Sequence, residues 1–233
     1  MHAHATRRRL FAGSLVLAAG LAACSDTSID ANPVAPAITV LSAGTGVDAQ
    51  TGTVGQPLTT PISVRATDPS GAPISGVVVS WTVRSGGGTV DNATSTTDAD
   101  GNVVVHWTLG TVAGADSLLG TTSNGATSII AATALADAPA SIAEVSGDQQ
   151  NVSTGAAAAP LVVKIADKYG NPIAGVTVSW AVSGGATLSA PTSTTDATGV
   201  AQEALTMGTA PGAYTITASA LNLTPVSFTL TGE

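Results

Sequence analysis

The chain is organised around the stretch Gly-Asn-Pro-Ile-Ala-Gly-Val-Thr-Val-Ser-Trp at residues 170–180. A similar stretch, Gly-Ala-Pro-Ile-Ser-Gly-Val-Val-Val-Ser-Trp, occupies residues 71–81, which lie 99 residues upstream. Each copy opens with Gly and Pro, which favour a turn, and continues with β-branched residues, which favour a strand. Both strands carry one Trp at the same place. This duplication predicts two similar β domains.

The composition favours an all-β protein with an acidic surface. Thr, Ser, Val, Ala and Gly dominate, and the sequence pI is about 4.5. Three of the seven basic residues are Arg7, Arg8 and Arg9, so four basic residues face fifteen acidic ones in the rest of the chain. This balance argues against a nucleic acid partner, which needs a basic surface. It indicates solubility and weak self-association, with a surface that attracts cations as the alternative.

Residues 1–23 are predicted to be a signal peptide. After the three Arg residues comes an apolar run from Leu10 to Ala23, which is too short to cross a bilayer as a helix because a crossing needs about 20 residues. The run ends in Leu21-Ala22-Ala23-Cys24 and resembles the bacterial lipoprotein signal. This resemblance implies a diacylglycerol on Cys24 and acylation of its new amino group. The lipid would make a membrane the partner, because more than one acyl chain anchors a protein stably.

The same segment is compatible with two export routes. It also indicates the membrane to which the protein is sorted. The Arg residues also resemble a twin-arginine motif, but general secretory signals begin with basic residues too. Ser25, rather than Asp, follows Cys24. By resemblance to lipoprotein sorting in Gram-negative cells, this favours the outer membrane, with the domains facing the periplasm or the surface. Residues 24–35 are predicted to be the lipidated Cys and a flexible tether.

Two predicted domains follow, at residues 36–135 and 139–232. In the first, an apolar strand is expected at 37–41 and an alternating strand at 61–68. Two later strands each place four apolar side chains on one face. These inward residues are Val77, Val79, Trp81 and Val83 in one strand, and Val103, Val105, Trp107 and Leu109 in the other. The second domain repeats this pattern around Trp180.

The four residues 136–139 join the domains. Because a short linker with a Pro limits swing, we expect the domains to sit end to end with restricted freedom. After the Trp strand the spacing between corresponding residues of the two copies falls from 99 to 98, so the second copy is one residue shorter there. We place the missing residue in the Gly-rich loop that follows the Trp strand. Glu203 falls on an inward position, where an unpaired carboxylate is costly. We therefore expect an irregular strand edge there, caused by a bulge, a partner at Lys164 or Lys168, or access to water.

About seven short strands per domain, with a turn signal roughly every 8–12 residues, are typical of an immunoglobulin-like Greek-key sandwich. Cys24 is the only Cys in the chain, so no disulfide can form within either domain. Each domain must therefore be held by aliphatic packing around its Trp. The sequence predicts an all-β protein with two tandem immunoglobulin-like Greek-key β-sandwiches after a lipoprotein signal peptide.

Three stretches of the second domain resemble bacterial immunoglobulin-like domains of the intimin/invasin type. They are Asp-Lys-Tyr-Gly-Asn-Pro-Ile-Ala-Gly-Val at 167–176, Ser-Thr-Thr-Asp at 193–196, and Gly-Thr-Ala-Pro-Gly-Ala-Tyr-Thr-Ile-Thr-Ala at 208–218. In the first domain, Pro-Ser-Gly-Ala-Pro at 69–73 stands for the usual Gly-Asn-Pro turn. The resemblance implies rigid spacers or adhesive stalks on cell surfaces, usually in longer arrays.

Few residues have the pattern of a catalytic or metal site. His106 is the only His after the signal peptide, and alternation points it away from the core, so neither a zinc site nor a hydrolase triad is indicated. The stretch Asp98-Ala99-Asp100-Gly101 faintly resembles a calcium loop, but it lacks the closing Glu and is better interpreted as a turn. Tyr169 lies in a turn, where it is the aromatic residue expected at the surface.

The sequence therefore predicts no enzyme, no cofactor and no metal, and one modified residue, Cys24. The leading hypothesis is a non-catalytic, lipid-anchored cell-envelope protein whose tandem domains act as a structural spacer or adhesion module. The alternative is a lipoprotein that binds an envelope polysaccharide or protein through loops at one end of a sandwich. A cell-surface protein or polysaccharide is the candidate partner.

Overall fold

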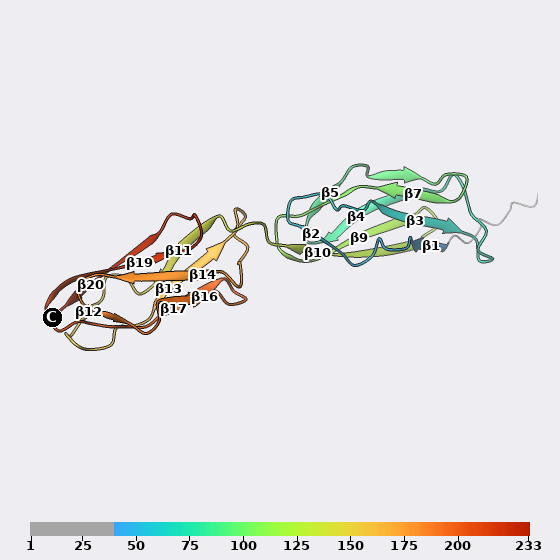
Figure 1. The fold of residues 1–233 in the computed structure, drawn as a ribbon. Helices are drawn as coiled ribbons and strands as arrows, with labels where there is room; N and C mark the ends of the chain where they lie inside the picture. Colours follow the sequence, from blue (N-terminus) through green and yellow to red (C-terminus); the bar gives the residue numbers. More distant parts are fainter. Residues whose placement is uncertain (1–39) are drawn as a thin grey trace, which may run out of the picture. The chain divides into compact units, whose positions relative to one another are not determined.

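The computed structural model describes residues 40–233, and these belong to one compact unit. The predicted signal peptide, Cys24 and the tether lie outside the described residues. Twenty β-strands make up the described chain (Figure 1). In chain order they are β1 (Val40–Ala43), β2 (Gln50–Thr53), β3 (Ile62–Thr67), β4 (Val78–Ser85), β5 (Gly88–Val90), β6 (Thr94–Thr96), β7 (Asn102–Val105), β8 (Trp107–Leu109), β9 (Gly114–Thr122), β10 (Thr127–Leu135), β11 (Ser141–Ser146), β12 (Asn151–Val152), β13 (Leu161–Ala166), β14 (Thr177–Val182), β15 (Thr187–Leu188), β16 (Thr192–Thr194), β17 (Val200–Glu203), β18 (Leu205–Thr206), β19 (Gly212–Ser219) and β20 (Val226–Gly232).

The first sandwich has two main layers. One is a three-stranded sheet in the order β1-β3-β7, and the other is a five-stranded sheet in the order β2-β10-β9-β4-β6. The second sandwich repeats this topology as β11-β13-β17 and β12-β20-β19-β14-β16. Neighbouring strands are antiparallel, except that β2 and β12 run parallel to β10 and β20. The predicted class, all-β with immunoglobulin-like sandwiches, is confirmed.

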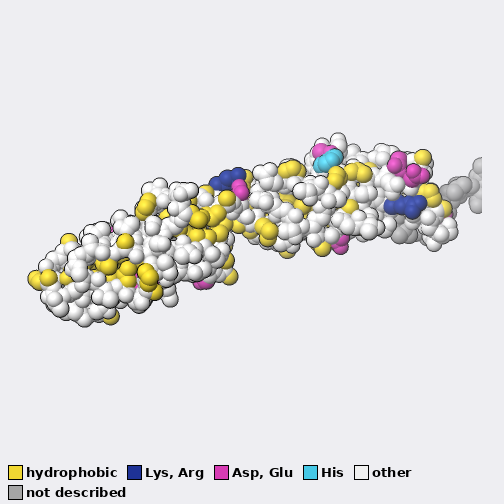
Figure 2. Space-filling model, in the orientation of Figure 1, with side chains coloured by type: hydrophobic (Ala, Val, Ile, Leu, Met, Phe, Trp, Pro, Cys, Tyr) yellow, Lys and Arg dark blue, Asp and Glu magenta, His cyan; other side chains and the backbone are white. Residues whose placement is uncertain are grey.

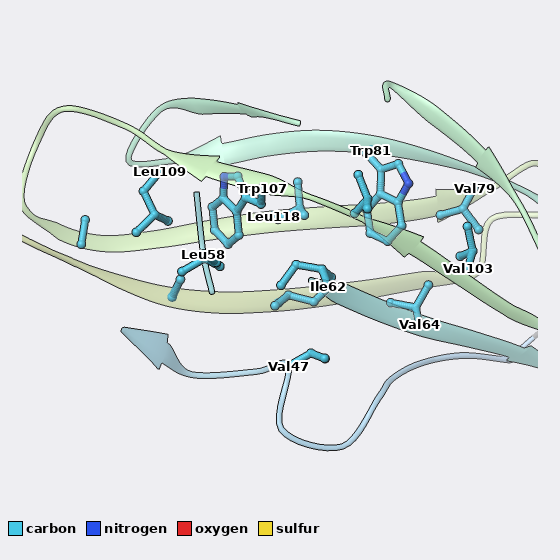
Figure 3. Packing of buried hydrophobic residues seen from close by; sticks show 14 of the residues in the cluster. Val47, Leu58, Ile62, Val64, Val79, Trp81, Val103, Trp107, Leu109 and Leu118 are labelled. Carbon is cyan, nitrogen blue, oxygen red and sulfur yellow. The ribbon is translucent and has the colours of Figure 1, made fainter. Parts of the chain in front are cut away.

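Each sandwich is held by apolar side chains from alternate positions of facing strands. Trp81, Trp107 and Trp180 are buried, as alternation predicts. In the first sandwich the rings of Trp81 and Trp107 lie between the two sheets, close to Leu118 (Figure 3). In the second, Trp180 packs against Phe228 with ring centroids 6.1 Å apart. Since neither sandwich contains a Cys, this apolar burial is the main source of stability.

The Ser-Thr-Thr-Asp motif fastens the Trp strand to the turn before it. The Trp180 indole donates from Nε1 to Ser193 Oγ at 2.8 Å. The buried Thr195 hydroxyl accepts from the Val176 amide at 2.9 Å and donates to the Ile173 carbonyl at 2.8 Å. The first sandwich repeats all three hydrogen bonds at the equivalent positions. The motif therefore supplies hydrogen bonds to polar groups that the fold buries.

The strand predicted around His106 is interrupted at that residue. The sequence did not predict this interruption in the first sandwich. The strand divides into β7, which pairs with β3, and β8, which pairs with β5. The second sandwich is broken at Ala204, so the irregularity expected beside Glu203 is confirmed. Of the three explanations offered, a partner at Lys164 or Lys168 is not the one that the structure shows. Glu203 is buried, and its Oε1 accepts from Ser189 Oγ and from the Ala190 amide, both at 2.7 Å.

The extra residue of the first domain lies in β4, and its predicted place in the Gly loop is wrong. The register of β4 on β9 shifts between Val83 and Ser85, whereas β14 pairs with β19 without a shift. This β-bulge takes up one residue while the core face continues on either side of it. The ribbon β5-β8 then pairs in the same register as β15-β18.

Replacing Thr195 with Val is expected to destabilise the second sandwich by about 1–3 kcal/mol, because a buried amide and a buried carbonyl lose their partner. Denaturant unfolding measures the change. Thr194→Val, at the exposed neighbouring position, is the control and is expected to change stability by less than about 0.5 kcal/mol. Equal losses in the two variants would contradict the role given to the Thr195 hydroxyl.

Candidate functional site

The candidate site is the junction where a turn of the second sandwich, residues 167–171, meets a loop of the first, residues 110–113. Asp167 follows β13, and its Oδ1 accepts hydrogen bonds from the amides of Tyr169 at 2.8 Å and Asn171 at 2.9 Å. An Asp side chain that bonds the backbone two residues later closes a tight turn. The turn presents the Asn171 side chain to the loop.

The Asn171 side chain is buried and joins three segments of the chain. Its Oδ1 accepts from the Ala113 amide at 2.8 Å, and its Nδ2 donates to the Thr111 carbonyl at 2.8 Å. The same Nδ2 donates to Asp167 Oδ2 at 2.8 Å, and that oxygen also accepts from the amide of Asp137 in the linker at 3.0 Å. One amide group thus ties the first sandwich to the turn that holds the linker.

Two exposed side chains of the turn add weaker contacts. Lys168 Nζ lies 2.9 Å from Asp137 Oδ2 and 4.9 Å from the centre of the Tyr169 ring. Tyr169 is 41% exposed, as the sequence indicated. Its hydroxyl nevertheless lies against Gly55 of the first sandwich, where a Cβ would come within 2.5 Å of it. An exposed ion pair contributes about 0–1 kcal/mol, so the buried Asn171 bonds are the stronger part of the junction.

The charges at the junction favour ionised Asp residues. Burial pushes the pKa of the Asp167 carboxyl upward, but hydrogen bonds from Asn171, Asp137 and Tyr169 outweigh it and hold the pKa below its ordinary value. The hydrogen bond from Lys168 lowers the pKa of Asp137, and the same contact raises the pKa of Lys168. Acid that protonates Asp167 therefore removes an acceptor that both Asn171 and the linker use.

The matching turn and loop elsewhere in the protein lack the key groups of the junction. Ala72 stands where the second sandwich has Asn171, and Pro211 stands where the first has Ala113. Pro has no amide hydrogen to donate. The sequence analysis missed the role of Asn171. The signal that could have found it is this Asn-to-Ala difference between two turns that share their Asp and Gly residues.

The other residues singled out from the sequence lie away from the junction. His106 is exposed, and its Nδ1 lies 2.9 Å from Asp91 Oδ2, a contact that lowers the pKa of Asp91. Asp98 accepts from the amides of Asp100 and Asn102, which confirms the interpretation as a turn. Within residues 40–233, no group of three or more His, Cys, Asp or Glu side chains is arranged to hold a metal ion. No helix in that same range has the length and apolar character to cross a membrane.

A family model matches most of the second sandwich. Residues 143–231 match the model of the bacterial Ig-like domain (group 1). The match spans less than half of the chain. The first sandwich lies outside the matched residues, although it has the same topology as the second.

The solved structures with a similar fold include adhesins and glycosyl hydrolases. InvD of Yersinia pseudotuberculosis matches with a TM-score of 0.50 and 18% identity, over 84% of this chain and 58% of that one. The Escherichia coli adhesin FdeC has a TM-score of 0.47 and 22% identity, over 82% of this chain and 63% of that one. The D0-D1 domain of intimin has a TM-score of 0.33 and 21% identity, over 83% of this chain and 96% of that one. The comparison with curated proteins gives no match. The InvD match supports the fold, and the chain spans about 60% of the InvD and FdeC chains.

Replacing Asn171 with Asp is expected to loosen the junction, because a carboxylate cannot donate to Thr111 and would repel Asp167. The loss of a buried hydrogen bond costs about 1–3 kcal/mol. Hydrogen-exchange protection of the Ala113 amide, which bonds Asn171, is expected to fall about tenfold or more. Asn151→Asp, on exposed β12, is the matched control. Unchanged protection of Ala113 in the Asn171 variant would contradict the bridge.

The junction is also expected to weaken in acid. Because the pKa of Asp167 is depressed in the folded protein, its contribution is complete above its ordinary value of 3.8 and is lost as the pH falls through the folded pKa. Protection of the Ala113 amide, corrected for the intrinsic exchange rate, is expected to fall below pH 3.8. If the protein stays folded and protection of the Ala113 amide is constant down to pH 2.5, the junction does not require the ionised form of Asp167.

Proposed function

We propose that this protein is a non-catalytic, lipid-anchored component of the cell envelope whose tandem domains act as a spacer or adhesion module. The observation that carries the proposal is the Asn171 bridge. A spacer holds its far end at a defined distance only if its joints resist bending. Here a buried side chain with three hydrogen bonds crosses the joint, beside a linker of four residues.

The surface supports a structural role over a catalytic one. Charged side chains form isolated spots on the face shown in Figure 2, and most of that face is uncharged. His106, the one His of the described chain, is paired with Asp91 in an exposed position, where solvent screens their interaction. Fold alone does not decide activity, so the non-catalytic part of the proposal is supported by these side chains.

The polysaccharide-binding alternative has less support. Binding by stacking needs exposed aromatic rings. All three Trp residues are buried, and Tyr169, the exposed aromatic side chain of residues 42–233, lies against Gly55. We therefore keep a cell-surface protein or polysaccharide as a candidate contact of an adhesive module, and do not propose a dedicated sugar site.

The lipid anchor is tested by Cys24→Ser. The variant is expected to lose incorporation of labelled fatty acid and to move from the membrane fraction to the soluble fraction, because all three acyl chains depend on this residue. Ser25→Ala is the control and keeps both properties. A Cys24→Ser protein that still sediments with membranes would contradict lipid anchoring.

Protease treatment of intact cells tests the placement of the domains. Release of the region 36–232 from whole cells supports a surface module that can adhere. Protection until the outer membrane is opened would exclude adhesion to other cells and leave a periplasmic spacer.

A further inference from the structure

A buried carboxylate in the first sandwich makes none of the hydrogen bonds that form the junction. Asp116, the third residue of β9, is 2% exposed. Neither of its carboxylate oxygens has a hydrogen-bond partner among the described residues. Such a group is costly to bury when ionised. It therefore needs an explanation beyond packing.

The second sandwich shows what this position normally holds. The third residue of β19 is Tyr214, which is also buried. A Cβ on Gly184 would come within 2.8 Å of its ring, and its hydroxyl donates to the Ala210 carbonyl. The ring thus fills the space beneath the glycine loop and satisfies its own polar atom. Asp116 also reaches its glycine loop, but its polar atoms have no hydrogen-bond partner.

The glycine loop of the first sandwich lies directly over Asp116. Gly86, Gly87 and Gly88 all have positive φ, at 78°, 79° and 93°. A Cβ on Gly86 would collide with the Asp116 carboxylate, and a Cβ on Gly110 would collide with the Gly86 carbonyl. Only residues without side chains can approach this closely with these backbone angles. A cleft of about 700 Å³ lies alongside, lined by residues 86–89 and 108–112.

The glycine loop contacts the segment 110–113, and the same segment binds Asn171. The Gly110 carbonyl accepts from the Gly55 amide at 2.8 Å. Thr111 and Ala113, directly after it, make the two bonds that cross to Asn171. A movement of the glycine loop away from Gly110 would therefore free one side of the segment that anchors the junction.

We propose that Asp116 is a proton-operated latch for the junction. While its carboxyl group is neutral, the Gly86–Gly88 loop stays closed over it. When the carboxyl group releases its proton to water, the charge must be hydrated, the loop lifts, and the segment 110–113 loosens its hold on Asn171.

No other charged group of the described residues near Asp116 is placed to control the loop, so we assign the control to the proton of Asp116 itself. Burial raises the pKa of the carboxyl, and the nearby Gly110 amide offsets this only in part. Ala132 lies opposite on β10, and the loop above is glycine, so no charged group faces it from these elements. Arg84, the charged residue of neighbouring β4, is exposed. The closed loop is thus favoured at low pH and loses stability as the pH rises above 3.8, which is the opposite sign to Asp167.

The test measures hydrogen exchange of the full-length protein between pH 4.5 and 8, corrected for the intrinsic rate. One peptide window covers residues 84–89, and the Ala113 amide reports the junction. In the wild type, opening is expected to increase by up to tenfold per pH unit until the raised pKa is passed, because one proton is released. Asp116→Asn, which keeps the shape without the charge, is expected to abolish this dependence at both places.

Two further variants separate the latch from general destabilisation. Asp100→Asn removes an exposed carboxylate of the same sandwich and is expected to behave like the wild type. Asp116→Tyr, which copies the second sandwich, is expected to remove the pH dependence and serves if Asp116→Asn fails to fold. A wild type without pH dependence, or an Asp116→Asn variant that keeps it, would overturn the proposal. Loop opening that leaves the Ala113 amide unchanged would overturn the coupling to the junction.

Discussion

Both sandwiches depend on one constraint: the alternate side chains of short strands must meet around a tryptophan with no covalent cross-link to help them. The aliphatic residues supply the burial, but burial also removes some polar groups from water. The Ser-Thr-Thr-Asp motif provides hydrogen-bond partners for such groups next to Trp180 and its counterpart Trp81. This explains why the motif persists in both copies while the strands around it differ. The hydroxyl groups serve the same core as the apolar residues.

The sequence carried enough information for the class of fold. Period-two alternation placed the three Trp residues inside and His106 outside, because the direction of a side chain on a strand is fixed by its position. The duplicated turns gave the repeat. The break at His106 was not predictable in this way. The residues on both sides of it remain buried, so the pattern of burial continues across a point where the strand changes partner.

The junction was harder to predict, for a different physical reason. Its central residue, Asn171, lies in a turn whose composition already suits a turn, so nothing in the local pattern demands a second role. That role depends on the Thr111 carbonyl and the Ala113 amide, about 60 residues away. Asp116 was overlooked because a single acidic residue beside Ala and Ser in a strand is usually exposed. Only the comparison with Tyr214 in the folded protein shows what its place requires.

The exchange of Asn171 for Ala72 and of Ala113 for Pro211 has a consequence for how such a protein can be assembled. The two repeats share a topology, yet they are not interchangeable parts. The loop between β18 and β19 in the second sandwich has a Pro nitrogen where the junction requires a donor, and the turn of the first sandwich has an Ala methyl group where the junction requires a side-chain amide. A chain with the repeats in reverse order would contain the same two folds and lack the contact between them. The contact between the domains therefore depends on their order, through the residues at positions 113 and 171.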